Sequence, residues 1–385
     1  MNSISICLGF LFGDEGKGAF VNYLCSKSNN PLVIRFNGGH QCGHTVVIDD
    51  KRHVFSNFGS GTLLGAPTYW SEYCTVNPVG ILKEGNALRK MEIHPQLFIN
   101  ANAMITTPFD ILKNIKLDSL NLHGTVGVGF GTTIKRNEDF FHLYARDLQY
   151  PKIRDIKLKL LQEKYYEYIS LANSKTQKII DDFKLACDDL VSRFDIVNTI
   201  YDIYLLGSSI PTDYFDLIFE GGQGIMLDMD YGFFPHVTRS NTTSKNAIEI
   251  INKLGITINE RNVDTYYITR AYQTRHGNGP MTNEGMDISY IKDNPLETNV
   301  NDGWQGVFRK SILDIGLLRY AFDCDNYNNP KSRKNVVVTC LDQVPDKVPV
   351  TGIGGGKLIT VDATAIGSCI GIPKQFSSYS DKGID

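Results

Sequence analysis

The sequence lacks any cluster of cysteines. Its eight cysteines lie far apart along the 385 residues, and no two of them form a CxxC pair. A structural zinc site or a disulfide framework needs cysteines at short, regular spacing. The scattered cysteines therefore argue against both and favour a reducing compartment, so we expect a cytoplasmic protein.

Charge of either sign is not in excess. The chain carries 39 basic and 42 acidic side chains, which leaves a net charge of −3, and no charged tail stands out. A protein that binds nucleic acid through its phosphates usually has a basic excess. We therefore expect no nucleic-acid partner, although a local basic pocket for a small phosphate remains compatible with this balance.

Long apolar runs are also missing. The apolar segment at residues 4–12 has no basic leader and continues directly into Gly13-Asp14-Glu15. It is too short to cross a bilayer and does not have the pattern of a signal peptide. It is predicted to be a buried strand, and no membrane partner is expected.

What the chain does contain is a recurring pattern in which a short apolar run ends in a glycine-rich or polar loop. The runs cover residues 4–12, 32–36, 215–219 and 265–269, and a fifth run at 336–339 ends near Asp342 without glycine. Near-continuous apolar strands indicate an α/β fold, with a largely parallel sheet flanked by helices. Ligands in such sheets bind at the carboxyl ends of the strands, so these loops should converge on one cleft.

The first glycine loop, residues 13–18, lies between a predicted strand and a predicted helix at 19–24. Its glycines, the helix start and Lys17 suit a phosphate. It is not a Walker loop, because position 11 is leucine and position 18 is glycine. A carboxylate beside phosphate is repelled unless it binds a metal or removes a proton, so Asp14 suggests one of these roles. The alternative is a tight turn with solvated charges.

The second loop, residues 38–47, contains His40 and His44. Two histidines four residues apart could bind a metal from one face of a helix, but the three glycines around them make a helix unfavourable. A loop histidine that donates a hydrogen bond to a phosphoryl oxygen fits this segment better.

This loop and four other stretches of the sequence resemble the adenylosuccinate synthetase family. The matching stretches occur in family order at 13–18, 38–45, 220–232, 235–243 and 274–284, and the resemblance extends to about residue 342. It implies a large central, mostly parallel sheet flanked by helices, similar to P-loop NTPases. It also implies a single domain over residues 1–385 with a helical subregion at about 150–205, and a homodimer.

The resemblance implies a two-step ligase reaction. A base removes the N1 proton of IMP or a similar 6-oxopurine nucleotide, and O6 attacks the γ-phosphate of GTP. Aspartate then displaces phosphate from C6 and gives adenylosuccinate. By this resemblance Asp14 is the base, His44 is the acid at the phosphoryl group, and Mg²⁺ is bound by Asp14 and the backbone carbonyl of Gly43.

The remaining site residues are also taken from the resemblance. Those expected to bind GTP and its phosphates are Gly13, Glu15, Gly16, Lys17, Gly18, Gly43, Thr45, Arg309 and Asp342. Those expected to bind the purine nucleotide are Gln41, Thr125, Gln223 and Thr238. The loop for the amine substrate is expected to use Gln305, Arg309 and Lys310. The carboxylate of Asp342 can accept from guanine N1–H and N2–H together, which favours GTP as the donor.

The chain departs from the family pattern at several positions. An arginine-rich loop that grips the amino acid is reduced here to Arg309 and Lys310, and Cys340 replaces a lysine. Val126 and Val128 replace a threonine and an arginine of a glycine-rich stretch. The arginine that one family subunit lends to its neighbour falls near Phe140, for which Lys135, Arg136 or Arg146 are possible substitutes.

These departures leave other functions open. One is a paralogue that uses a different amine or a different purine nucleotide, such as dGMP, which would give a 2-amino-succinoadenylate. A viral branch with that product replaces the first-loop aspartate by serine, so Asp14 argues against it. Another is a nucleotide-binding pseudoenzyme, against which Asp14, Lys17 and His44 speak. The last alternative function is a GTPase that hydrolyses the nucleotide without a purine acceptor.

Overall fold

The computed structural model describes residues 3–121, 126–166, 174–206, 216–295, 297, 306–353 and 356–379. Thr125 and Gln305, both expected in the site, lie outside these residues. Within the described ranges, no helix combines the length and the apolar character needed to cross a membrane.

A nine-stranded sheet forms the centre of the molecule, in the order β18-β15-β11-β1-β10-β2-β5-β7-β9. Every neighbouring pair in it is parallel, so the predicted parallel sheet is confirmed. Its strands are β1 (Ile4–Gly9), β2 (Pro31–Arg35), β5 (Thr68–Trp70), β7 (Leu97–Asn100), β9 (Asp195–Val197), β10 (Asp216–Glu220), β11 (Val263–Arg270), β15 (Arg333–Thr339) and β18 (Gln375–Ser377).

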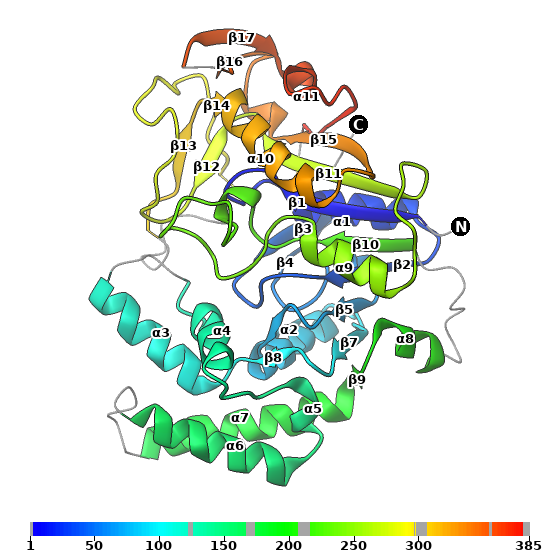
Figure 1. Cartoon of the computed structure of the whole chain (residues 1–385), viewed down its shortest axis with the longest axis vertical. Coiled ribbons are helices and arrows are strands. Elements are labelled where there is room, and N and C mark those ends of the chain that lie inside the picture. Colours follow the sequence, from blue (N-terminus) through cyan, green and yellow to red (C-terminus); the bar gives the residue numbers. More distant parts are fainter. Residues whose placement is uncertain are drawn as a thin grey trace.

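Alternate residues of the central strands point to opposite faces and meet different helices. Ile4, Ile6 and Leu8 belong to a core that includes residues of α9 (Lys245–Lys253) and α10 (Ile315–Asn328). Cys7 belongs to a second core with residues of α1 (Lys17–Lys27). Figure 1 shows α9 and α10 on the near face and α1 behind the sheet. Because both faces are covered, β1 is buried along its whole length.

The other elements lie at the two ends of the sheet (Figure 1). At one end are α2 (Pro78–Lys90), α3 (Pro108–Asn121), α4 (Phe130–Glu138), α5 (Ala145–Leu148), α6 (Pro151–Lys164), α7 (Ser174–Arg193) and α8 (Ile200–Leu206). At the other are β12 (Gln273–Arg275), β13 (Arg309–Ser311), β14 (Leu313–Asp314), β16 (Lys347–Thr351), β17 (Leu358–Asp362) and α11 (Ile366–Cys369). Shorter pairs are β3 (His44–Ile48) with β4 (Lys51–Phe55), and β6 (Thr75–Val76) with β8 (Met104–Ile105).

Candidate active site

A cavity of about 1340 Å³ opens where β1, β2, β10, β11 and β15 lead into their loops, and α3 and α4 close another side of it. This volume exceeds what one small ligand usually occupies, so the cavity has room for more than one substrate. It is lined by most of the residues expected from the sequence: Gly13, Asp14, Glu15, Gly16, Lys17, Gly18, Gln41, Gly43, His44, Thr45, Gln223, Thr238 and Asp342.

Arg309 and Lys310 lie elsewhere, since neither is among the described residues that line the cavity. Arg309 forms an ion pair with Glu284, and its Nη2 donates to the carbonyls of Gly277 at 2.7 Å and Gly279 at 2.5 Å. The Lys310 ammonium lies 2.9 Å from an exposed carboxylate oxygen of Asp293. Arg309 therefore holds the loop after β12 in place.

The loop between β1 and α1 is stabilised by hydrogen bonds to the side chain of one of its own residues, Glu15. The carboxylate of Glu15 accepts from the backbone N–H of Leu11 at 2.7 Å and of Gly13 at 3.2 Å. Burial raises the pKa of Glu15 to about 8, although Lys17 and these N–H groups act to lower it. Lys17 is itself only 3% exposed. Glu15 thus shapes the loop, a role that its place in the motif did not indicate.

Gly9 makes this arrangement possible. A Cβ at this position would lie 2.2 Å from the carbonyl oxygen of Gln223, 2.5 Å from Oε2 of Glu15 and 2.9 Å from Nζ of Lys17. No side chain fits there without displacing backbone. Sequence reasoning did not single out Gly9, because a glycine at the end of an apolar strand has no distinctive pattern.

Asp14 is fixed by Arg270, the last residue of β11, and by His276, which directly follows β12. Its backbone has a φ of 55°, and its carbonyl oxygen accepts from Nε of Arg270 at 2.5 Å. Oδ2 of Asp14 lies 3.2 Å from Nε2 of His276. The ring of His276 in turn packs on Phe308, with centroids 4.9 Å apart. His276 was not predicted, since it stands at a variable position of its motif and is distant from Asp14 in sequence.

His44 is the first residue of β3 rather than a loop residue, and it pairs with a buried carboxylate. Its Nδ1 lies 2.5 Å from Oε1 of Glu220, at the end of β10. Ser60 donates to the same carboxylate through its hydroxyl and through its backbone N–H, the latter at 3.0 Å. Burial lowers the pKa of His44 to about 4. Burial alone would raise the pKa of Glu220, yet His44, Arg35 and Ser60 lower it to about 2.

These two pKa shifts determine which of the two side chains, His44 or Glu220, carries a proton near neutral pH. Glu220 is ionised and can only accept, so the neutral imidazole of His44 must place its proton on Nδ1. Nε2 of His44 is then the nitrogen available to a ligand in the cavity. An arriving phosphate would add negative charge nearby and favour the imidazolium, which can donate from Nε2.

Two glutamine amides in the cavity have unsatisfied polar atoms. Both polar atoms of the Gln41 amide and Oε1 of Gln223 are buried without a hydrogen-bond partner among the described residues. A buried amide without a partner is costly, so such atoms indicate groups that a ligand satisfies. Asp342 differs, because it is exposed on the short 3-10 helix Leu341–Gln343 after β15.

The cavity has the oxygen donors that a hard cation needs. Across the described residues, no group of three or more His, Cys, Asp or Glu side chains could by itself hold a metal. Mg²⁺ usually takes one or two protein oxygens and completes its shell with substrate phosphates and water. The carboxylate of Asp14 and the backbone of Gly43, which line the same cavity, are compatible with that mode.

Comparisons with known proteins agree on one family. The family model described as adenylosuccinate synthetase matches residues 6–350. The adenylosuccinate synthetase of Buchnera aphidicola is 32% identical over 356 residues, which are 90% of this chain and 79% of that protein. The enzyme of Picrophilus torridus is 29% identical over 364 residues, 92% of this chain and 81% of its own.

Solved structures show the same fold. Fully ligated adenylosuccinate synthetase from Plasmodium falciparum aligns over 100% of this chain and 99% of its own, with a TM-score of 0.76 and 18% identity. Cyanophage S-2L succinoaminodeoxyadenylate synthetase, bound to dGMP and to dATP as an energy donor, covers 99% of this chain and 94% of its own, with a TM-score of 0.64 and 15% identity. At these identities the likeness concerns the fold alone.

Proposed function

This chain belongs to the adenylosuccinate synthetase family of C–N ligases, and we propose that it phosphorylates O6 of IMP, or of a related 6-oxopurine nucleotide, with GTP and joins aspartate at C6. One observation carries the proposal. The carboxylate of Asp14, the ammonium of Lys17 and the imidazole of His44 line one cavity together with the amide of Gln223, whose Oε1 has no hydrogen-bond partner among the described residues. We expect the enzyme to act as a cytoplasmic homodimer.

In the first step Asp14 accepts the N1 proton of the purine. The electron pair moves to O6, which bonds to the γ-phosphorus as the bond to the β,γ-bridging oxygen breaks and GDP leaves. Lys17 and the N–H groups of the loop stabilise charge on the phosphates, and His44 donates from Nε2 to the transferring group. A magnesium ion held by Asp14 and the Gly43 carbonyl would neutralise further phosphate charge.

In the second step the amine nitrogen of aspartate attacks C6, the C6–O6 bond breaks, and phosphate leaves with O6 and takes up the proton that the attacking nitrogen loses. Phosphorylation is needed because an amide-like carbonyl oxygen is a poor leaving group. Gln223 can pair with both the carbonyl and the N–H edge of the bound 6-oxopurine, which would hold the ring until Asp14 accepts the N1 proton in the first step. Asp342 would select guanine in the donor, since adenine offers no such donor pair.

The proposal is tested by phosphate release. The purified protein is mixed with GTP, magnesium, IMP and aspartate, and each component is then omitted in turn. Release that requires both IMP and aspartate supports the ligase. Release with GTP alone identifies a GTPase. No release from a folded protein that binds nucleotides contradicts the ligase with IMP and aspartate, and is the result expected of a pseudoenzyme or of a paralogue with other substrates.

A paralogue with another amine or nucleotide is the second candidate. It is favoured by Arg309, whose guanidinium is already committed to Glu284 and to the carbonyls of Gly277 and Gly279. A dicarboxylate needs several charge-assisted donors. Assays with a panel of amino acids, with dGMP in place of IMP and with ATP or dATP in place of GTP, separate the two candidates.

A further inference from the structure

A group of cations lines the cavity beside α3 and α4, and the five matching motifs assign it no role. It consists of Lys113 on α3, Lys135 on α4 and Arg239, which directly follows Thr238. Glu138 lines the cavity beside them. We call Lys135, Glu138 and Arg239 the α4 cluster.

Arg239 stands on a rigid stretch of backbone. The N–H of Thr238 donates to the carbonyl of Leu227 at 2.8 Å, and the carbonyl of Ser240 accepts from Met229 at 3.1 Å. The side chain then runs along α4, where a Cβ on Gly131 would lie 3.8 Å from its Cδ. These contacts fix where the guanidinium can reach.

The guanidinium of Arg239 is available to a ligand. It is half-exposed, and its partner among the described residues is Glu138, with Nη1 and Oε2 3.0 Å apart. Glu138 also lies 3.8 Å from the ammonium of Lys135, which is held more closely by Asp139 at 2.9 Å. Exposed ion pairs of this kind contribute little to stability, so an incoming anion can displace Glu138 at small cost.

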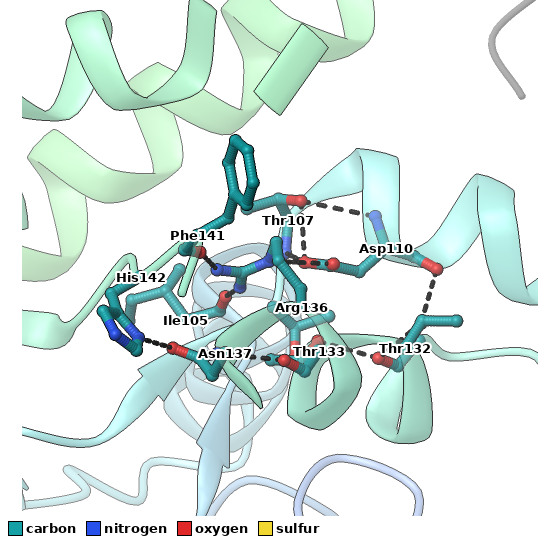
Figure 2. A network of polar contacts seen from close by, with 11 residues as sticks. Ile105, Thr107, Asp110, Thr132, Thr133, Arg136, Asn137, Phe141 and His142 are labelled. Atoms are coloured by element: carbon teal, nitrogen blue, oxygen red, sulfur yellow. Dashed lines mark hydrogen bonds and ion pairs between the residues drawn. The ribbon is translucent and has the colours of Figure 1, made fainter. Parts of the chain in front are cut away.

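The neighbouring arginines cannot serve in its place. Arg136 is fully buried, and it donates to Asp110 and to the backbone carbonyls of Phe141 and Ile105 (Figure 2). This network attaches α4 to α3 and so positions the α4 cluster. Arg146 is bonded to Asn102 and does not belong to the described residues that line the cavity.

We infer that Arg239, assisted by Lys135, binds the 5′-phosphate of the purine mononucleotide within a single subunit. The identity of the nucleotide rests on the proposed function. Gln223, Thr238 and Arg239 line the same cavity, so a nucleotide with its base at Gln223 and its nucleoside beside Thr238 is expected to place its 5′-phosphate at Arg239. The planar guanidinium can give a phosphate two parallel hydrogen bonds, and Glu138 occupies that position until the phosphate arrives.

The test compares a mononucleotide with its nucleoside. Isothermal titration calorimetry measures the Kd of IMP and of inosine, or dGMP and deoxyguanosine, for the full chain and for Arg239→Gln. Arg333→Gln is the matched control, because Arg333 is equally exposed and is also paired with a carboxylate, that of Asp264. Glu138→Gln removes the competing anion.

Arg239→Gln should weaken mononucleotide binding about tenfold or more and leave nucleoside binding unchanged. It should also raise KM for the mononucleotide without changing KM for GTP. Glu138→Gln should tighten mononucleotide binding several-fold, and Arg333→Gln should bind like the unmodified protein. Unchanged mononucleotide affinity in Arg239→Gln, or an equal loss for nucleoside and mononucleotide, overturns the inference.

The same titrations separate this inference from the proposed function. Phosphate-dependent binding that is lost in Arg239→Gln, in a protein without turnover, contradicts the ligase activity but supports the phosphate site. A protein that turns over normally while Arg239→Gln keeps its mononucleotide KM contradicts only the phosphate site. A chain that binds no purine mononucleotide at all contradicts both.

Discussion

Nδ1 of His44 lies 2.5 Å from Oε1 of Glu220, and the two side chains are 6% and 0% exposed. The carboxylate determines which ring nitrogen carries the proton and keeps Nε2 for the cavity. This pairing joins the start of β3 to the end of β10 and gives the proposed acid a fixed orientation.

Glu220→Gln should therefore lower kcat about 10- to 100-fold with little change in KM for either nucleotide, because the neutral amide no longer stabilises a donating imidazolium. Steady-state kinetics measure this. Ser60→Ala is the matched control: it removes a hydroxyl donor from the same carboxylate but keeps the charge. Its effect should be smaller. An unchanged kcat in Glu220→Gln would remove Glu220 from the mechanism.

The same pair should make the ligand-free protein sensitive to acid. In the folded state His44 binds its proton near pH 4, whereas its ordinary pKa is 6.5. Below pH 6.5 the unfolded chain therefore holds more protons, and stability falls as the pH drops toward 4. Glu220, with a folded pKa of about 2 against 4.5, continues this loss from pH 4.5 downward.

Denaturant unfolding at pH 7 and pH 5 measures this effect. The contribution of His44 to the difference in unfolding free energy should be about 2 kcal/mol. His44→Asn should shrink the difference by that amount, whatever its stability at pH 7. An equal pH dependence in both proteins would contradict the lowered pKa, because it would show that folding leaves the pKa of His44 near its ordinary value.

Asp14→Asn should reduce turnover by about 10²- to 10⁴-fold, because the amide cannot accept the N1 proton. Purine mononucleotide binding should remain close to that of the unmodified protein, since Gln223 and Thr238 are untouched. Asp50→Asn, an exposed acid in the turn between β3 and β4, serves as the control. Turnover that survives Asp14→Asn would contradict the assignment of the base.

Gly9→Ala should lose nucleotide binding and about 1–3 kcal/mol of stability, because its Cβ would overlap the carbonyl of Gln223, Oε2 of Glu15 and Nζ of Lys17. Gly85→Ala in α2 is the comparison. A Cβ there has ordinary contacts, the nearest at 3.5 Å from Phe58. Thermal unfolding and GTP titration of both variants check this. Equal behaviour of the two would mean that the β1–α1 loop tolerates a side chain.

Much of the central sheet was predictable from the sequence. The apolar runs at 32–36, 215–219, 265–269 and 336–339 correspond to β2, β10, β11 and β15, because buried parallel strands need apolar side chains on both faces. The first run was predicted too long. Its strand ends at Gly9, and Phe10–Phe12 already belong to the loop although all three are buried.

The outer strands of the sheet and the order of its strands could not be predicted from apolar runs in the sequence. β5 and β9 have only three residues each and no long apolar run. Their pairing depends on partners far away in the chain, which local patterns do not encode.

In the candidate site, too, some residues were predictable from local sequence patterns and others were not. The glycine loops and their charged residues were visible in the sequence, because phosphate binding demands a local pattern. The partners Glu220 and His276 were not, since each acts through a side chain that is close in space and distant in sequence.

The most direct test of the ligase mechanism follows the purine oxygen. IMP labelled with ¹⁸O at O6, or whichever 6-oxopurine nucleotide is accepted, is turned over with GTP and aspartate, and the released phosphate is analysed by mass spectrometry. Attack of O6 on the γ-phosphate predicts that the phosphate carries the label in every turnover. Unlabelled phosphate, with its new oxygen taken from water, would contradict the mechanism.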